Sequence, residues 1–517
     1  MSNKKLAKNI GSMSSAVFLS RISGLARDIF MTGFFGTTYV ADAFNAAYQI
    51  PNLLRKLFGE GALSAAFIPI YNEIKLKEGK SGQIKFALNV LSLLSLFLLV
   101  LCLLGIFLAP LIVRLLAPGF DAQTYTLAVK LTKILFPYLF LIGLSSTLIS
   151  IANSHDYFFI PGLSSAFLNL AMIGTPAIFI LLHQNTSSVS QITFLSFGVI
   201  LGGVLQTVVN LPLLKRIGYK LKVDLNIKGE AIHSVWKRFL PGVAGLAIRE
   251  VNLAADLIIA SFLATGGLAA LSYGNRLMQL PLGVFGVSAG VAVLPLFSRL
   301  SSEAKWDDLT KRLRFTFITL SLIMLPVTAF IIGTGRDVIR ILFMRGKFDL
   351  TSLNQTYEAL VFYSIGLLFF ALNRILIPIF YANKDTKTPV KISAVIVVIN
   401  ITLNLILMKF MGLAGLAFAT SISAFIHFVI LIKTMNRKLP KIQLPEIQNS
   451  VVKILFISLV IFVAAYFINR FVPAESTLQT VIRLLIHSTA GLLIFVSGAL
   501  LLKIENSRKI LKKLWKR

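Results

Sequence analysis

Four arginines interrupt long apolar segments of this sequence, and their chemistry most needs an explanation. They are Arg21, Arg27, Arg55 and Arg276. An arginine near the middle of a bilayer costs roughly 2.5–3.5 kcal/mol on insertion scales, so four facing lipid would cost about 10–14 kcal/mol. We therefore expect all four to face protein or a water-filled cavity. A planar guanidinium forms two parallel hydrogen bonds with a phosphate, so these residues predict an anionic, phosphate-bearing ligand.

Acidic and polar side chains that could share this cavity are few. The candidates are Asp28, Asp42, Asn52 and Glu60. Ion pairing between these acids and the arginines inside the protein is the alternative interpretation. The excess of cations over acids favours a ligand.

Helix geometry places these residues at depth. With a rise of about 1.5 Å per residue, Arg21 lies about 17 Å and Arg27 about 25 Å from the start of their segment. Arg21 and Asp28 share one helical face. Pro51 before Arg55, and two glycines after it, are expected to break the second segment and to free backbone groups that line a cavity.

The remaining cations in apolar segments have simpler interpretations. Lys130, Lys133 and Arg483 lie near segment ends, where long side chains reach the interface. Arg249 precedes Glu250, so we expect a local ion pair.

The composition requires many membrane crossings. The chain has 517 residues, of which 56% are hydrophobic and 14% charged, with a mean hydropathy of +0.82. Soluble proteins carry about 25% charged residues. At roughly 20 apolar residues per crossing, the hydrophobic content supplies about 14 helices. We predict an all-α, polytopic membrane protein.

The loop charges orient these helices. The net charge is +30. One set of alternate loops carries about 34 Lys and Arg and the other about 7, so the positive-inside rule places both termini in the cytoplasm. The charge therefore reflects topology, and no nucleic-acid partner is expected.

An internal repeat divides the chain. ARDIFMTGFFG (26–36) resembles AADLIIASFLA (254–264), and Pro51 matches Pro281 at a similar offset. Six crossings separate the matching positions, so the halves form a parallel repeat about an axis along the membrane normal. We predict a six-helix lobe at 1–222, a second at 223–445, and two extra helices with a basic tail at 446–517. These two helices either form an apolar groove for a lipid tail or only pad the fold.

Enzyme motifs are absent where they can be checked. The single cysteine, Cys102, excludes a disulfide or a thiolate metal site. GKSG (79–82) lacks the glycine that a phosphate-binding loop requires five positions earlier. The histidines are scattered without metal-ligand spacing. We expect no enzymatic activity and no required cofactor.

Three motifs resemble one family. Three stretches of the chain are similar to the MurJ (MviN) family of bacterial lipid II flippases. They are SRISGLARDIFMTGFFGTTYVADAFNAAYQIPNLLRKLFGEGALSAAFIPIY (20–71), NRLMQLPLGVFGVSAGVAVLP (275–295) and FYANKDTKTPVKI (380–392). The resemblance implies a two-lobed fold of the MOP exporter superfamily with two added C-terminal helices. It also implies that the family's essential arginines correspond to Arg21, Arg27, Arg55 and Arg276, and its acidic cavity residues to Asp28, Asp42 and Glu60.

The resemblance also implies a function. Such a protein moves lipid II, the undecaprenyl-diphosphate-linked disaccharide-pentapeptide, from the inner to the outer leaflet of the cytoplasmic membrane by alternating access. The expected partners are lipid II, the phospholipid bilayer and cell-wall synthesis proteins, with a monomer as the working form. The alternatives are a multidrug or cation antiporter of the same superfamily, whose pore would favour acids and aromatics, and a membrane scaffold for cell-wall synthesis without transport.

A monovalent-cation site is a further hypothesis. Asp256, Asn400, Asn404 and Thr420 lie at similar depths on three predicted helices. One carboxylate among neutral oxygen donors suits Na⁺ better than a divalent ion. The alternative is ordinary interhelical hydrogen bonding by Asn and Thr, with Asp256 protonated or paired to Arg249.

Overall fold

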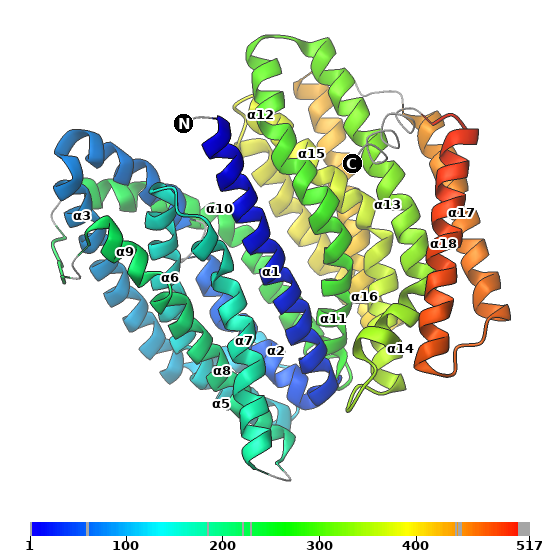
Figure 1. The fold of residues 1–517 in the computed structure, drawn as a ribbon, viewed down its shortest axis with the longest axis horizontal. Helices are drawn as coiled ribbons and strands as arrows, with labels where there is room; N and C mark the ends of the chain where they lie inside the picture. The colour runs from blue at the N-terminus through cyan, green and yellow to red at the C-terminus, as the bar shows by residue number, and fades with distance from the viewer. Residues whose placement is uncertain are drawn as a thin grey trace. The chain divides into compact units, whose positions relative to one another are not determined.

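The computed structural model describes residues 3–57, 62–183, 186–219, 222–227, 230–439, 442 and 447–504. Within these ranges every regular element is a helix, which confirms the all-α prediction (Figure 1). The chain divides into two compact units, Met1–Ala269 and Ala270–Arg517. The predicted lobe boundaries near 222 and 445 concern the sequence repeat and stay predictions.

The first unit contains ten helices in its described part. Helix α7 packs between α1 and α8, α2 packs on α5, and α3 packs on α6 and α10 (Figure 1). Their bounds are α1 (Asn3–Phe35), α2 (Tyr39–Arg55), α3 (Ala62–Phe107), α4 (Ala109–Leu116), α5 (Ala122–Leu135), α6 (Pro137–Ser154), α7 (Phe159–Leu182), α8 (Ser188–Val208), α9 (Leu211–Ile217) and α10 (Glu230–Ala260). The first turn of α11 also belongs to this unit.

The second unit holds the rest of α11 and the helices that follow. Helix α15 packs on α12 and α16, while α13 packs on α14, α17 and α18. Their bounds are α11 (Gly267–Pro281), the π-helical segment η2 (Leu282–Val287), α12 (Ser288–Ser302), α13 (Trp306–Phe343), α14 (Leu350–Ile365), α15 (Leu367–Ala382), α16 (Lys387–Lys438), α17 (Gln448–Phe471) and α18 (Thr477–Leu501).

Two of these helices are each interrupted by a glycine. Gly79 has a φ of 67° inside α3, and Gly412 has a φ of 54° inside α16. A straight helix of 52 residues would extend about 78 Å, far more than the roughly 30 Å of bilayer hydrocarbon. Each is therefore two helices joined at a left-handed glycine, which only glycine adopts without strain. Both breaks fall between segments that the hydropathy pattern separates.

The apolar helices make this a multi-pass membrane protein. Among the described residues, nine helical stretches are long and apolar enough to cross a bilayer, or ten if α14 and α15, bent by 44°, form one span. This criterion treats α3 and α16 as one stretch each and does not include α1, α2 or α10. The predicted total of fourteen crossings is not confirmed.

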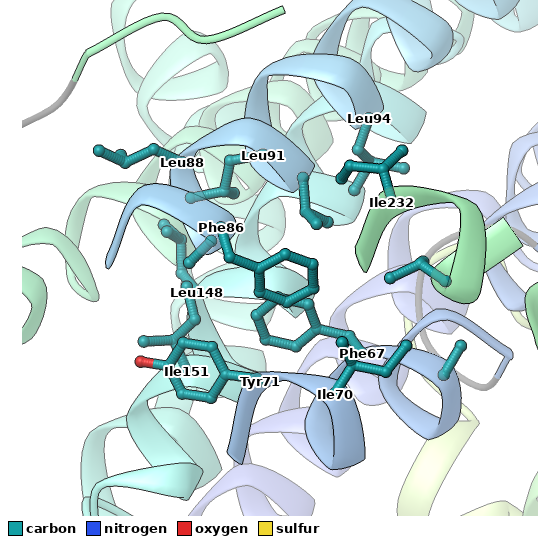
Figure 2. Packing of buried hydrophobic residues seen from close by; sticks show 14 of the residues in the cluster. Phe67, Ile70, Tyr71, Phe86, Leu88, Leu91, Leu94, Leu148, Ile151 and Ile232 are labelled. Atoms are coloured by element: carbon teal, nitrogen blue, oxygen red, sulfur yellow. The ribbon is translucent and has the colours of Figure 1, made fainter. Parts of the chain in front are cut away.

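One core cluster of the first unit joins α3, α6, α9 and α10 (Figure 2). Phe67 stacks on Phe86, with ring centroids 5.6 Å apart, and also on Tyr71, at 5.0 Å. Phe67 and Phe86 lie on opposite sides of the break at Gly79. The two halves of α3 therefore fold back against one another around an aromatic core.

A buried polar cluster fastens the end of this core. The Tyr71 hydroxyl lies 2.9 Å from His155 Nε2 and 2.5 Å from the Tyr219 hydroxyl. His155 ends α6, outside the membrane-spanning segment. Burial lowers the pKa of the His155 imidazole, and the charges of Lys75 and Lys80 lower it further. Tyr71, His155 and Tyr219 thus form one hydrogen-bonded cluster that ties α3 and α6 to the segment after α9.

The last two helices are attached to α13 by a buried ion pair. Arg483 on α18 binds Asp337 on α13 through both carboxylate oxygens, with Nε 2.8 Å from Oδ2, and also donates to the Val472 carbonyl. The side chains are 14% and 3% exposed. Asp337 therefore neutralises Arg483 inside the bundle, while its placement at the membrane interface stays a prediction.

Candidate functional site

Arg27 of α1 is held by two neighbours within the first unit. Its Nε and Nη2 donate to Asp28 Oδ1, at 3.1 and 2.9 Å. Its Nη1 donates to Asn169 Oδ1 on α7, at 2.9 Å. The Asn169 amide in turn donates to Ser23 Oγ, at 3.0 Å, and to the Ser20 carbonyl. Arg27 is thus fixed in one orientation, and Asp28 compensates its charge as the ion-pair interpretation expects.

Sequence reasoning missed Asn169. It is 5% exposed and is the only amide side chain in the apolar helix α7. An isolated amide in such a segment was a usable signal, because a buried amide needs hydrogen-bond partners. Which cation it serves depended on the packing of α7 against α1.

Arg21 differs from Arg27 although both lie on α1. Its side chain is exposed, and among the described residues no hydrogen bond or ion pair engages it. Six residues separate the two, about 9 Å along the helix. The side chains around Arg21, such as Phe18 and Ile22, are exposed and apolar. An unpaired guanidinium on an apolar surface is the arrangement that an anionic ligand would complete.

Arg55 is the last residue of α2 and is half-buried. Lys56 follows it and lies 3.5 Å from Glu250 on α10, which is 6% exposed. Glu250 therefore pairs with Lys56, while the Arg249 side chain lies outside the described residues. Asn52 donates to the Tyr48 carbonyl of its own helix, at 2.8 Å.

Asp42 holds a connection between distant segments of the first unit. Its oxygens accept from the backbone N–H groups of Gly266, at 2.5 Å, and Ala269, at 2.8 Å, and the residue is 5% exposed. These donors lie at the start of α11, where unpaired N–H groups favour a carboxylate. Gly266 has a φ of 88°, and a Cβ there would lie 2.1 Å from the Thr37 carbonyl oxygen. Asp42 is thus fully engaged by the backbone.

Two of the predicted cavity residues, Glu60 and Arg276, do not lie in the described part of the first unit. Glu60 lies outside the described residues. Arg276 lies half-buried on α11, within the second unit. Its convergence with Arg21, Arg27 and Arg55 stays a prediction.

The predicted cation ligands form ordinary hydrogen bonds. Asn404 donates to Asn400 Oδ1, at 3.2 Å, and Asn400 donates to Ser423 Oγ, also at 3.2 Å. Thr420 donates to a carbonyl of its own helix. Asp256, in the first unit, accepts from Asn252 at 3.1 Å.

These bonds match the interhelical alternative for the second unit, because Asn400 and Ser423 lie on opposite sides of Gly412. No group of three or more His, Cys, Asp or Glu with metal-binding geometry occurs in the described part of the chain. The Na⁺ site stays a hypothesis.

The fold and these side chains define a class of protein: a polytopic helical membrane protein with arginines set into its apolar helices. The family model described as "Lipid II flippase MurJ" matches residues 31–487. The chain therefore belongs to the MurJ family. The resemblance seen in its motifs is confirmed.

Individual relatives agree with this assignment. A "Probable lipid II flippase MurJ" of Buchnera aphidicola subsp. Baizongia pistaciae (strain Bp) is 33% identical over 432 residues, 83% of each chain. A solved structure described as "Lipid II flippase MurJ, inward closed conformation" has a TM-score of 0.79 and 28% identity, with 94% of this chain and 97% of that chain covered.

A more distant solved structure shows how widely the fold is shared. An inward-facing multidrug resistance MATE family transporter of the MOP superfamily has a TM-score of 0.68 at 15% identity, with 83% of this chain and 98% of that chain covered. At that identity the likeness concerns the fold alone. Function must therefore be argued from the family and from the charged residues.

Proposed function

We propose that this chain is a transporter that flips lipid II from the inner to the outer leaflet of a bacterial cytoplasmic membrane, as part of peptidoglycan synthesis. Membership of the MurJ family supports the substrate. The observation that carries the mechanism is Arg21, an exposed guanidinium on α1 that no other described residue engages and that exposed apolar side chains surround. We assign it, together with Arg27, Arg55 and Arg276, to binding of the substrate's diphosphate.

The mechanism follows from the charge and the repeat. A diphosphate head group cannot cross hydrocarbon alone, because desolvating its charges costs far more than one binding step returns. Guanidinium groups in a water-filled cavity replace that solvation, and rocking of two repeated lobes then exposes the cavity to either side. No covalent bond changes, so the protein acts as a transporter without catalysis. Both termini lie in the cytoplasm, and a monomer suffices.

A Na⁺ gradient is one candidate energy source for this transport. Na⁺ bound by Asp256, Asn400, Asn404 and Thr420 would couple transport to an ion gradient. Measured Na⁺ binding to the purified protein, lost in Asp256→Asn, is the expected result. No detectable binding by the parent protein would reject this site and leave the flippase proposal intact.

Leaflet-resolved accessibility of lipid II tests the proposed function directly. Cells depleted of this protein are expected to accumulate lipid II in the inner leaflet, and re-expression should restore its outer-leaflet exposure. Arg21→Ala should fail to restore it, and Arg21→Lys should restore it poorly, since lysine loses the planar fork. The matched control is Arg299→Ala, at an exposed helix end.

Two outcomes would contradict the proposal. Normal outer-leaflet lipid II in depleted cells would favour the scaffold alternative. Cation-dependent drug efflux by the purified protein, without movement of lipid II, would favour the antiporter alternative.

A further inference from the structure

An open apolar hollow lies in the first unit between α3 and α10. Its volume is about 390 Å³, including the mouth. Val90, Leu94 and Phe97 line it from α3, and Ile232 and Trp236 are among the residues that line it from α10. Leu94 and Ile232 lie next to one another in Figure 2. The hollow is thus a notch in the edge of the core cluster that joins these helices.

The mouth of this hollow opens on a surface suited to lipid. Trp236 at its rim is 38% exposed, and Leu96 and Leu99 on the same stretch of α3 are 50% and 45% exposed. Helix α3 has the highest mean hydropathy of the candidate membrane spans. Exposed apolar side chains on such a helix face acyl chains. A tryptophan at the rim is typical of the membrane–water interface.

Basic residues surround one end of the hollow. Asn89 donates to the Asp224 carbonyl, at 2.8 Å, and Ser92 Oγ accepts from the Asp224 N–H, at 3.0 Å. These bonds hold segment 222–227 against α3 beside Val90. Two exposed lysines belong to this end: Lys85, one turn before Asn89, and Lys222 in the held segment.

The described acid at this end, Asp224, already forms hydrogen bonds. The Asp224 carboxylate accepts from the Asn226 N–H, at 3.1 Å, and from Asn89, at 3.2 Å. The lysines therefore give this end a net positive charge. An apolar slot below a cationic rim is complementary to a lipid with an anionic head group.

We propose that this hollow binds an anionic phospholipid of the surrounding bilayer, with one acyl chain between α3 and α10 and the phosphate at Lys85 and Lys222. The slot extends from Val90 to Phe97, about 11 Å along the helix. That length is shorter than one leaflet, which is about 15 Å of hydrocarbon. It suits part of one acyl chain rather than the long polyprenyl chain of the transported lipid.

The tryptophan at the rim provides the test. In the full chain carrying Trp306→Phe and Trp515→Phe, Trp236 is the only tryptophan. The protein is reconstituted into phosphatidylethanolamine vesicles with a minor fraction of either phosphatidylglycerol or phosphatidylethanolamine brominated in the acyl chains. Bromine quenches tryptophan on contact, so the brominated phosphatidylglycerol should quench Trp236 more strongly at equal content.

Variants of the lysines and of the slot separate the contribution of the lipid head group from that of the acyl chain. Replacing Lys85 and Lys222 with glutamine should reduce the preference for phosphatidylglycerol by about fivefold per lysine, from about 1 kcal/mol per basic residue near an anionic surface. The matched control replaces Lys311 and Lys387, exposed lysines of the second unit, and should leave the preference unchanged. Leu93 also lines the hollow from α3, so Leu93→Phe should fill the slot and reduce quenching by either lipid.

Three outcomes would overturn the proposal. They are equal quenching by the two brominated lipids, a preference that survives removal of the two lysines, and stoichiometric loss of quenching when purified lipid II is added. The last would identify the occupant as the transported lipid. Matching circular dichroism and gel-filtration profiles confirm that each variant is folded.

Discussion

The ion pair between Asp337 and Arg483 should contribute strongly to holding the last two helices on α13. Asp337→Asn keeps the size of the side chain but leaves the guanidinium, 14% exposed, without its counter-charge. Breaking a buried pair by removing one partner typically costs 3–5 kcal/mol. Because Arg483 keeps its bond to the Val472 carbonyl, we expect the lower end, about 3 kcal/mol of unfolding free energy.

A pair of fluorescent labels, one near the last two helices and one on α13, measures this loss of unfolding free energy. The chain has one cysteine, so Cys102→Ser gives a background in which Ala474→Cys and a cysteine on α13 carry a fluorescent pair. Separation of the two probes is then followed during reversible unfolding in mixed micelles. Arg336→Gln, an exposed cation next to Asp337, is the matched control and should change the free energy by less than about 0.5 kcal/mol.

The double variant sharpens the argument. Asp337→Leu combined with Arg483→Met removes both charges, so no uncompensated ion is left in the protein. Replacing a buried pair with apolar residues is often neutral or stabilising by about 1–4 kcal/mol. The double variant should therefore be at least 2 kcal/mol more stable than Asp337→Asn, by roughly the same reasoning. If Asp337→Asn behaves like Arg336→Gln, the reasoning is refuted.

Three further predictions concern the first unit. Gly266→Ala should lower the free energy of unfolding by about 1–3 kcal/mol in thermal unfolding, because its φ is positive and the added methyl group would meet backbone atoms. Gly174→Ala is the control and should not lower it, because open space surrounds Gly174. Asn169→Leu removes the neutral acceptor of Arg27 and should cost about 1.5–3 kcal/mol in the same assay. The pKa of His155 is lowered in the folded state, so the unfolded state binds more protons, and unfolding free energy should fall as pH drops below about 6.5; His155→Gln should flatten that slope.

Much of the helical framework could be predicted from the sequence, because the features that indicate a membrane helix are local in the sequence. Apolar runs located the long helices, and polar gaps with glycine located the breaks at Gly79 and Gly412. Both signals act over a few residues. They share one cause, because backbone N–H and C=O groups must form their hydrogen bonds within a helix wherever lipid surrounds it. The family resemblance rested on equally local motifs.

The partners of the charged residues could be predicted much less well. Arg27 and Asn169 are 142 residues apart, and Arg483 and Asp337 are 146 apart. The position of Arg483 near a helix end gave no sign of its carboxylate partner on α13. Helical depth gives one coordinate of a side chain, whereas pairing depends on rotation about the helix and on which helices pack together.

The structure therefore divides these arginines by how their charge is satisfied. Asp337 neutralises Arg483, and Asp28 with Asn169 engages Arg27, so each of these has an internal explanation for its place in an apolar helix. Arg21 has none among the described residues, and it is exposed. Because an uncompensated arginine costs several kcal/mol at depth, a sequence that keeps one must recover that cost from something outside the described chain. For a MurJ-family chain the anionic head group of the transported lipid is the candidate, and that makes Arg21 the residue at which a ligand explanation is most strongly required.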